Sequence, residues 1–126
     1  MTLPLALIVE DEPKLCQIFS LALKQGGFEI EVISDGQIAS EKLATLVPYI
    51  VILDLHLPNI SGKELLRQIR SDVRLADTKV MVVTADAAMA DGLVDDSDLV
   101  LIKPVSFNQL RDLAIRLGPP DTFDMP

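Results

Sequence analysis

The sequence predicts an α/β fold in which helices cover both faces of a parallel, doubly wound sheet. Five short apolar runs recur along the chain, and four of them are almost continuously apolar, which is typical of strands buried on both faces of such a sheet. Segments with helical periodicity lie between the runs, and alternating strands and helices indicate parallel strands joined by right-handed crossovers. The predicted strands are 5–9, 28–33, 49–53, 79–83 and 99–102.

The run FEIEVI at 28–33 differs from the others because apolar and acidic residues alternate in it. Alternation of this kind is expected for a strand that has one face in water. We therefore predict that this strand lies at an edge of the sheet.

Four helices are predicted from the spacing of apolar residues and from residues typical of helix ends. Pro13 suits the first turn of the first helix and Gly26 follows its end, while Glu12 is expected to be a solvated residue favoured by the helix dipole. Ser61 stands three residues before Glu64, which is the pattern of a capping box. The predicted helices span 13–25, 36–46, 61–71 and 106–117.

Two segments carry weaker signals. In 36–46, Ile38, Leu43 and Leu46 form only a loose apolar stripe. The segment 85–98 contains a glycine and five aspartates, so any helix there is expected to be short or irregular.

Composition narrows the class of protein. The chain has 126 residues, which suits one domain, and a net charge of −8, which repels nucleic acids and anionic lipid. The single cysteine, Cys16, lies in an apolar helical pattern and is expected to be a small buried thiol in a reducing compartment. The run Leu3 to Val9 is too short for a membrane span and has no basic leader. We therefore expect a cytoplasmic domain that binds neither DNA nor membranes directly.

Polar residues follow four of the five predicted strands. Glu10 and Asp11 follow the first, Asp54 the third, Thr84 the fourth and Lys103 the fifth, whereas the second contributes nothing obvious. Because ligands bind at the carboxyl ends of parallel strands, these side chains are expected to share one rim of the sheet.

Such a rim favours metal-assisted phosphoryl transfer. Neighbouring carboxylates repel one another, and a small set of oxygen ligands with room for water and phosphate suits Mg²⁺. Lys103 and the hydroxyl of Thr84 could hold the oxygens of a transferring phosphoryl group. Asp54 would then be the nucleophile and would form an acyl phosphate.

Four motifs, LIVEDE, VILDLHLPNISG, VVTA and IKP, occur in this order at the ends of predicted strands. Together they resemble the receiver domain of two-component response regulators, over about residues 4 to 117. The resemblance implies a flavodoxin-like, five-stranded sheet with strand order 2-1-3-4-5. We expect the receiver domain to span 1–118 and a linker or disordered tail to span 119–126, which contains three prolines.

The resemblance also implies roles for individual residues. Asp54 is the expected phospho-acceptor, Thr84 the switch hydroxyl and Lys103 the residue that pairs with the phosphate, with a cis bond between Lys103 and Pro104. The implied ligands of Mg²⁺ are the carboxylates of Asp11 and Asp54, the backbone carbonyl of His56 and, through water, Glu10.

The implied partners are those of a signalling domain. A sensor histidine kinase or a phosphotransfer protein would supply the phosphoryl group, and a separate partner or a C-terminal output domain would receive the signal. A homodimer through the last helix and strand is a further option. Such a domain promotes its own phosphorylation but turns over no external substrate, so it is not expected to be an enzyme.

Departures from the family pattern leave alternatives open. Val100 stands where the family usually has an aromatic residue, which leaves a pseudo-receiver that binds partners without phosphorylation as the alternative function. An aspartyl phosphatase would need a second aspartate two residues after Asp54, where His56 stands. A contact between His56 and Asp86 across the site is a hypothesis for how the lifetime of an acyl phosphate is set.

Overall fold

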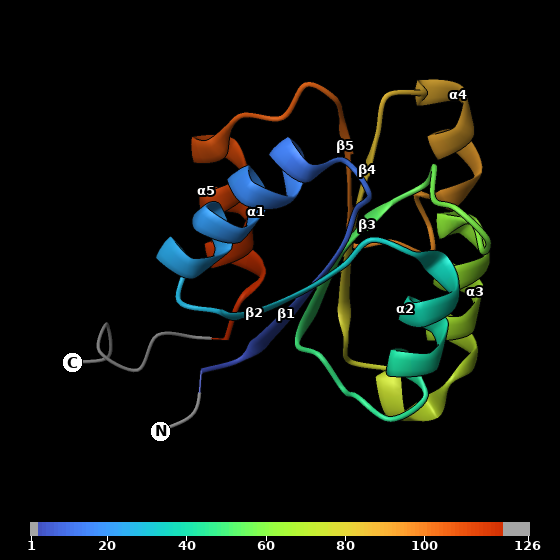
Figure 1. Cartoon of the computed structure of the whole chain (residues 1–126). Coiled ribbons are helices and arrows are strands. Elements are labelled where there is room, and N and C mark those ends of the chain that lie inside the picture. The colour runs from blue at the N-terminus through green and yellow to red at the C-terminus, as the bar shows by residue number, and fades with distance from the viewer. Residues whose placement is uncertain (1–2, 120–126) are drawn as a thin grey trace.

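Five parallel strands form one sheet in the order β2-β1-β3-β4-β5, which confirms the predicted topology (Figure 1). The computed structural model describes residues 3–119. Strand β2 lies at an edge, as its alternating sequence predicts. The strands are β1 (Leu5–Val9), β2 (Glu29–Ile33), β3 (Ile50–Asp54), β4 (Lys79–Thr84) and β5 (Leu99–Ile102).

Helices cover both faces of this sheet. Helices α1 and α5 lie on one face, and α2, α3 and α4 lie on the other (Figure 1). The helices are α1 (Pro13–Gln25), α2 (Gly36–Leu43), α3 (Gly62–Ser71), α4 (Ala87–Ala90) and α5 (Phe107–Leu117), with the 3-10 turns η1 (Val73–Leu75) and η2 (Asp91–Leu93). None of the described helices is long and apolar enough to cross a bilayer.

The two faces bury separate apolar clusters, which explains why the strands are continuously apolar. Successive side chains of a strand point to opposite faces, so Leu7 and Val9 join the cluster beneath α2 and α3. Ala6 and Ile8 join the cluster beneath α1 and α5. All four residues are completely buried, so β1 has no face in water.

Side-chain caps start the helices where the sequence predicts. Ser61 Oγ accepts a hydrogen bond from Glu64 N at 3.3 Å, as expected for the start of α3. Glu12 caps α1, because its carboxylate accepts from Lys14 N and Leu15 N. Each cap satisfies amides that have no partner within the helix.

Helix α2 differs from the sequence-based expectation, whereas the segment 85–98 agrees with it. Helix α2 ends at Leu43 rather than near residue 46, because the chain then tightens into turns in which Ala44 N donates to Glu41 O and Thr45 N donates to Lys42 O. Its Ile38 is 48% exposed, so the expected stripe is wrong at this position, and Ala39 faces the core instead. The segment 85–98 forms only the single turn of α4 and a 3-10 turn, as its composition predicts.

Candidate functional site

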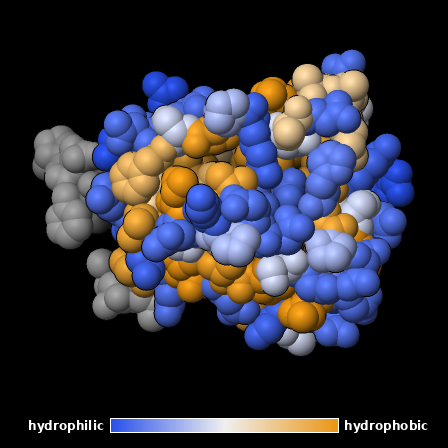
Figure 2. All heavy atoms as spheres, turned by 45° about the horizontal axis from the view of Figure 1, so that its top comes forward, coloured by the Kyte–Doolittle hydropathy of each residue, from blue (hydrophilic) through white to orange (hydrophobic). Residues whose placement is uncertain are grey.

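The carboxyl ends of four strands bring the predicted polar residues to one rim of the sheet. Asp54 is the last residue of β3 and is 3% exposed, and Thr84, the last residue of β4, is completely buried. Glu10 directly follows β1 and Lys103 directly follows β5. Figure 2 turns this end of the sheet toward the reader and shows hydrophilic residues gathered between hydrophobic patches.

Three acidic side chains meet at this rim. One carboxylate oxygen from each of Glu10, Asp11 and Asp54 lies within 4.8 Å of the other two. Glu10 and Asp54 are buried, whereas Asp11 is exposed and leaves the cluster open to solvent on one side. A set of carboxylate oxygens this close together suits a hard divalent cation such as Mg²⁺.

Lys103 lies between the two buried carboxylates. Its Nζ is 3.1 Å from Glu10 Oε1 and 3.7 Å from Asp54 Oδ1, so it is closer to Glu10. Its backbone amide donates to Thr84 O at 2.8 Å, which fixes the start of the β5–α5 loop against β4. The bond between Lys103 and Pro104 is cis, as expected.

Hydrogen bonds hold the carboxylate of Glu10 in place, but its negative charge is only partly balanced. Its Oε2 accepts hydrogen bonds from Asp11 N and Glu12 N, both at 3.1 Å. Its buried Oε1 accepts no hydrogen bond from residues 3–119 and has only the ion pair with Lys103. Burial, and then the charge of Asp54, raise the pKa of Glu10, and the backbone amide of Glu12 and Lys103 only partly oppose this rise. A buried carboxylate that has one oxygen without a hydrogen bond, in a cluster with two other carboxylates, fits a cation ligand, directly or through water.

The loop after Asp54 folds back onto the strand. His56 N donates to Asp54 Oδ1 at 3.2 Å, and Gly62 N donates to Leu55 O at 3.2 Å. A Cβ atom at Gly62 would lie 2.1 Å from Asp54 O, so only glycine allows α3 to start this close to the strand. The orientation of Asp54 is therefore set by backbone packing as well as by its side-chain contacts.

Thr84 lies on the same rim, but its hydroxyl contacts its own loop. Thr84 Oγ1 accepts from Asp86 N at 3.1 Å. Asp86 caps α4, with its Oδ1 accepting from Ala88 N at 3.0 Å. No hydrogen bond or ion pair joins Asp86 to His56 within residues 3–119, so the hypothesis of a contact between them is not supported. The capping role of Asp86 accounts for its orientation.

Sequence reasoning missed the contribution of the loop after β2. Gly36 N donates to Pro58 O at 3.1 Å, and the side chain of Asn59 donates to Asp35 Oδ2. These contacts join the loop before α2 to the loop that follows Asp54. The available signal is the Asp-Gly pair one residue after a strand, together with an asparagine next to Pro58 in the Asp54 loop.

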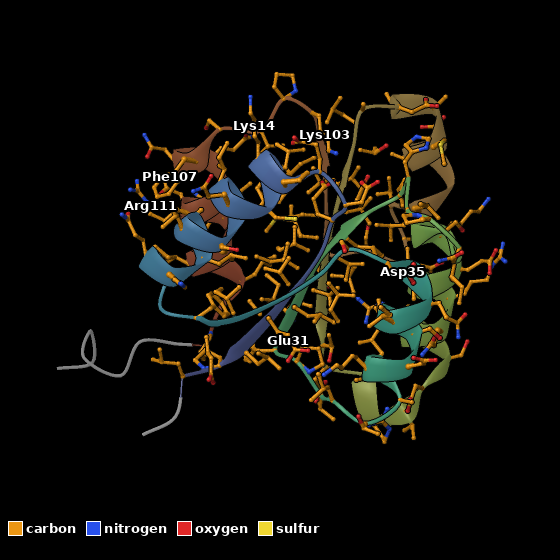
Figure 3. The ribbon with its side chains drawn as sticks, viewed as in Figure 1. Lys14, Glu31, Asp35, Lys103, Phe107 and Arg111 are labelled. Atoms are coloured by element: carbon orange, nitrogen blue, oxygen red, sulfur yellow. The ribbon has the colours of Figure 1, made fainter. Side chains whose placement is uncertain are left out.

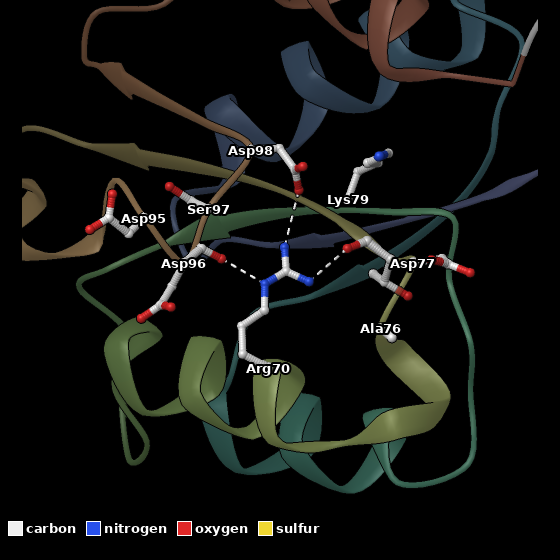
Figure 4. A pocket seen from close by; sticks show the side chains of 9 residues that line it. Arg70, Ala76, Asp77, Lys79, Asp95, Asp96, Ser97 and Asp98 are labelled. Atoms are coloured by element: carbon white, nitrogen blue, oxygen red, sulfur yellow. Dashed lines mark hydrogen bonds and ion pairs between the residues drawn. The ribbon is translucent and has the colours of Figure 1, made fainter.

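A second polar cluster lies at the opposite end of the sheet. A shallow pocket of about 300 Å³ is lined there by Arg70 and by residues that precede β4 and β5 (Figure 4). Arg70 donates to the backbone oxygens of Asp96 at 2.6 Å and Thr78 at 3.0 Å, and to Asp98 Oδ2 at 3.1 Å. Its guanidinium is therefore engaged by the chain itself, and the cluster joins the end of α3 to the loops before β4 and β5.

Solved structures of receiver domains share this fold. The chemotaxis response regulator CheY4 of Vibrio cholerae superposes with a TM-score of 0.82 at 24% identity, covering 92% of this chain and 99% of that one. The receiver domain of the sensor histidine kinase PA1611 from Pseudomonas aeruginosa superposes with a TM-score of 0.80 at 22% identity, covering 90% of this chain and 96% of that one. Both share the fold with this chain.

Sequence comparison identifies the family. The response regulator receiver domain matches residues 6–115. The transcriptional regulatory protein TrcR of Mycobacterium tuberculosis is 37% identical over 108 residues, which cover 82% of this chain and 41% of TrcR. The response regulator ArlR of Staphylococcus saprophyticus is 34% identical over 107 residues, covering 82% of this chain and 47% of ArlR. The chain thus spans less than half the length of these relatives, and it belongs to the response regulator receiver domain family.

Proposed function

We propose that this receiver domain accepts a phosphoryl group on Asp54 in a Mg²⁺-dependent reaction. The observation that carries the proposal is the position of Asp54, a buried carboxylate at the end of the central strand with Lys103 Nζ 3.7 Å from its Oδ1. Glu10 and Asp11 lie beside Asp54, close enough for a single cation to contact all three carboxylates. No other cluster of three such ligands is found within residues 3–119.

The residues present fit a magnesium ion. Asp11, Asp54 and the backbone carbonyl of His56 would hold it directly, and Glu10 would do so through water. When bound, the ion offsets the carboxylate charges and takes oxygens of the phosphoryl group. The related receiver domain of PA1611 is described with a magnesium ion coordinated in its active-site cleft, which supports the same chemistry here.

Transfer from a phosphohistidine donor requires one bond to form and one to break. A carboxylate oxygen of Asp54 attacks phosphorus, and the P–N bond to the donor imidazole breaks with its electron pair left on nitrogen, which then takes a proton. Lys103 is placed to neutralise charge that develops on the phosphoryl oxygens. The hydroxyl of Thr84, at the end of the adjacent strand, is proposed to donate to one of these oxygens.

The donor and the recipient of the signal follow from the same proposal. A sensor histidine kinase or a phosphotransfer protein would supply the phosphoryl group in the cytoplasm. The signal would pass to a partner or to an output domain, because relatives about twice as long include a protein named as a DNA-binding response regulator, MtrA of Mycolicibacterium smegmatis. The domain would promote its own phosphorylation and turn over no external substrate.

A small-molecule phosphodonor tests the proposal without a known kinase. The purified chain is incubated with acetyl phosphate and Mg²⁺, and intact and peptide mass spectrometry locate the label. One phosphoryl group is expected on the peptide that contains Asp54, and chelation of Mg²⁺ by EDTA should prevent labelling. Asp54→Asn should remove the label, whereas Asp95→Asn, which alters an exposed aspartate remote from the cluster, should retain it.

Two results would contradict the proposal. Labelling that persists in Asp54→Asn would place the phospho-acceptor elsewhere. A wild-type chain that binds Mg²⁺ but takes no label from acetyl phosphate or from phosphorylated donor proteins would favour the phosphorylation-independent pseudo-receiver. The presence of Asp54, Thr84 and Lys103 on one rim argues against that alternative.

A further inference from the structure

The loop between β2 and α2 reaches the rim through its backbone and through Asp35. Glu10 N donates to Ile33 O at 3.0 Å, so this loop begins beside the acidic residues that follow β1. Asp35 then caps α2, with its Oδ1 accepting from Gln37 N at 2.7 Å and from Ile38 N at 3.1 Å. Figure 3 shows Asp35 at the start of α2, at the same end of the sheet as Lys103.

The second carboxylate oxygen of Asp35 contacts the loop that follows Asp54. Asn59 Nδ2 donates a hydrogen bond to Asp35 Oδ2. Beside this contact, Gly36 N donates to Pro58 O at 3.1 Å. A Cβ atom at Gly36 would lie 1.9 Å from Ile60 O, so the two backbones touch here and a side chain could not fit between them. The loop 55–61 is thus braced against the first turn of α2.

Asn59 needs this brace because of its backbone conformation. Its φ is +71°, in the left-handed region that L-residues adopt at a cost and that asparagine tolerates better than most. A residue persists in this conformation where its surroundings hold it there. The hydrogen bond to Asp35 offsets the cost, and it fixes the direction in which the chain leaves Pro58.

The loop 55–61 contains His56, whose backbone carbonyl is the expected ligand of Mg²⁺. His56 lies between Asp54, to which its amide donates at 3.2 Å, and the braced residues Pro58 and Asn59. With the loop fixed on both sides of His56, the direction of the His56 carbonyl is fixed as well. Mutation of a group that orients a metal ligand typically lowers metal affinity or activity about 10- to 100-fold.

We propose that Asp35, acting through Asn59, is a positioning residue that sets the His56 carbonyl and thereby the affinity of the rim for Mg²⁺. The inference rests on the proposed function, because it assumes that the cation binds at Glu10, Asp11 and Asp54. It gives the second strand, which supplies no ligand, a part in the site through the loop that follows it. Neither Asp35 nor Asn59 touches the cation or the phosphoryl group in this arrangement.

Two single variants remove the contact without adding a clash or backbone strain of their own. Asn59→Gly loses the side chain, and glycine adopts a positive φ without strain. Asp35→Ser retains an oxygen that can cap α2 but loses the acceptor for Asn59. Affinity for Mg²⁺ alone is measured by calorimetric or NMR titration of the full chain, and each variant is expected to weaken binding about 10-fold. Asp95→Ser, which removes one exposed negative charge elsewhere, is the matched control and should bind as the wild type does.

A swapped pair separates positioning from a general loss of stability. Asp35→Asn combined with Asn59→Asp leaves the net charge unchanged, keeps a capping oxygen at position 35 and restores a hydrogen bond in the opposite direction. This double variant is expected to recover most of the wild-type affinity for Mg²⁺. Thermal unfolding without added metal, recorded on every variant, shows whether affinity follows the contact or the stability of the fold.

Each outcome either supports or overturns the positioning role of Asp35. Weaker binding in both single variants, with recovery in the swapped pair, supports the positioning role. Unchanged affinity in Asn59→Gly, or affinity losses that the swap does not restore, would overturn it while Mg²⁺ binding by the wild type left the proposed function standing. A wild-type chain that does not bind Mg²⁺ would remove the proposed function and this inference together.

Discussion

The two ends of the sheet hold charged groups in opposite ways. At the amino ends of β4 and β5, the guanidinium of Arg70 has three oxygen acceptors, and its partner Asp98 also accepts from Val80 N at 2.7 Å. At the carboxyl ends, Glu10 and Asp54 are both buried and share the single ammonium of Lys103. One cluster is satisfied by the chain itself, and the other has more negative charge than its own cation can balance.

This difference indicates what each end contributes. Partly buried charges that are paired and hydrogen-bonded, such as Arg70 and Asp98, join elements together, and removing one partner costs stability. Buried charges that lack compensation cost stability in themselves and are typical of sites that bind something else. Substitutions at the Arg70 end should therefore change stability alone, and those at the Lys103 end should change chemistry more than folding.

The largest effect is expected at Lys103. In Lys103→Met the developing charge on a phosphoryl group loses its positive partner, so the rate of phosphorylation by acetyl phosphate should fall about 100-fold. Rates are measured by mass spectrometry at saturating Mg²⁺. Lys63→Met, which alters an exposed lysine of α3, is the control. A variant that is phosphorylated at the wild-type rate would show that Lys103 plays no part in transfer.

Arg70→Met is expected to have the next largest effect, on folding alone. It removes three hydrogen bonds, those that Arg70 donates to Asp98 and to the Thr78 and Asp96 carbonyls, so the free energy of unfolding should fall by about 2 kcal/mol. Urea unfolding measures this, and Arg67→Met, on the exposed side of the same helix, should stay within about 0.5 kcal/mol of the wild type. The Mg²⁺ affinity of Arg70→Met should be unchanged, and a large loss of affinity would contradict the separation of the two ends.

The pH dependence of stability should reveal the cost of burying the charged form of Glu10. Because the pKa of Glu10 is raised in the folded chain above its ordinary value of 4.5, the stability present below that value is lost as the pH rises through the raised pKa. Glu10→Gln cannot titrate, so without Mg²⁺ its advantage in unfolding free energy over the wild type should grow from about pH 4 to about pH 7. Urea unfolding at several pH values measures this difference. A constant difference across that range would show that the pKa of Glu10 is not raised in the folded chain.

The smallest effect is expected at Cys16, because the charges of the acidic rim influence the pKa of its thiol. Burial, and then the charges of Glu10 and Asp11, raise the pKa of the Cys16 thiol, whose Sγ donates to Glu10 O at 3.1 Å. The thiolate is the reactive form, so alkylation by iodoacetamide near pH 8 should be slow. Mg²⁺ offsets the acidic charges and should accelerate alkylation by a factor of the order of two. Asp54→Asn, which weakens cation binding, should show little acceleration, and an equal acceleration in both proteins would point to a different cause.

The apolar runs made most of the fold predictable. The run 5–9 matches β1, because continuous burial in a parallel sheet leaves a clear trace in composition, and the run 99–102 matches β5 although this edge strand is only partly buried. The boundary of β3 is shifted by one residue, because Asp54 still pairs opposite Val83 although its side chain is polar. Periodicity also misjudged Ile38, since it locates an apolar stripe but not how much of that stripe a neighbouring element covers.

The sequence predicts that the candidate residues lie together on one rim, but it does not predict their contacts. Strand ends place Glu10, Asp54 and Lys103 together, since topology alone brings them to one rim. That Lys103 lies nearer Glu10 than Asp54 depends on side-chain lengths and packing, which no spacing encodes. The contact between Asp35 and Asn59 joins two loops distant in sequence and depends on how closely their backbones approach.

The strand order has a consequence for how the domain comes into being. The central strand carries Asp54, its two neighbours carry Glu10 and Thr84, and Lys103 comes from an outer strand laid down last in the sequence. No contiguous half of the polypeptide contains the whole set, so partly assembled chains lack a competent pocket. Uptake of a phosphoryl group at the proposed site would therefore also report that β1, β3, β4 and β5 have assembled in one sheet.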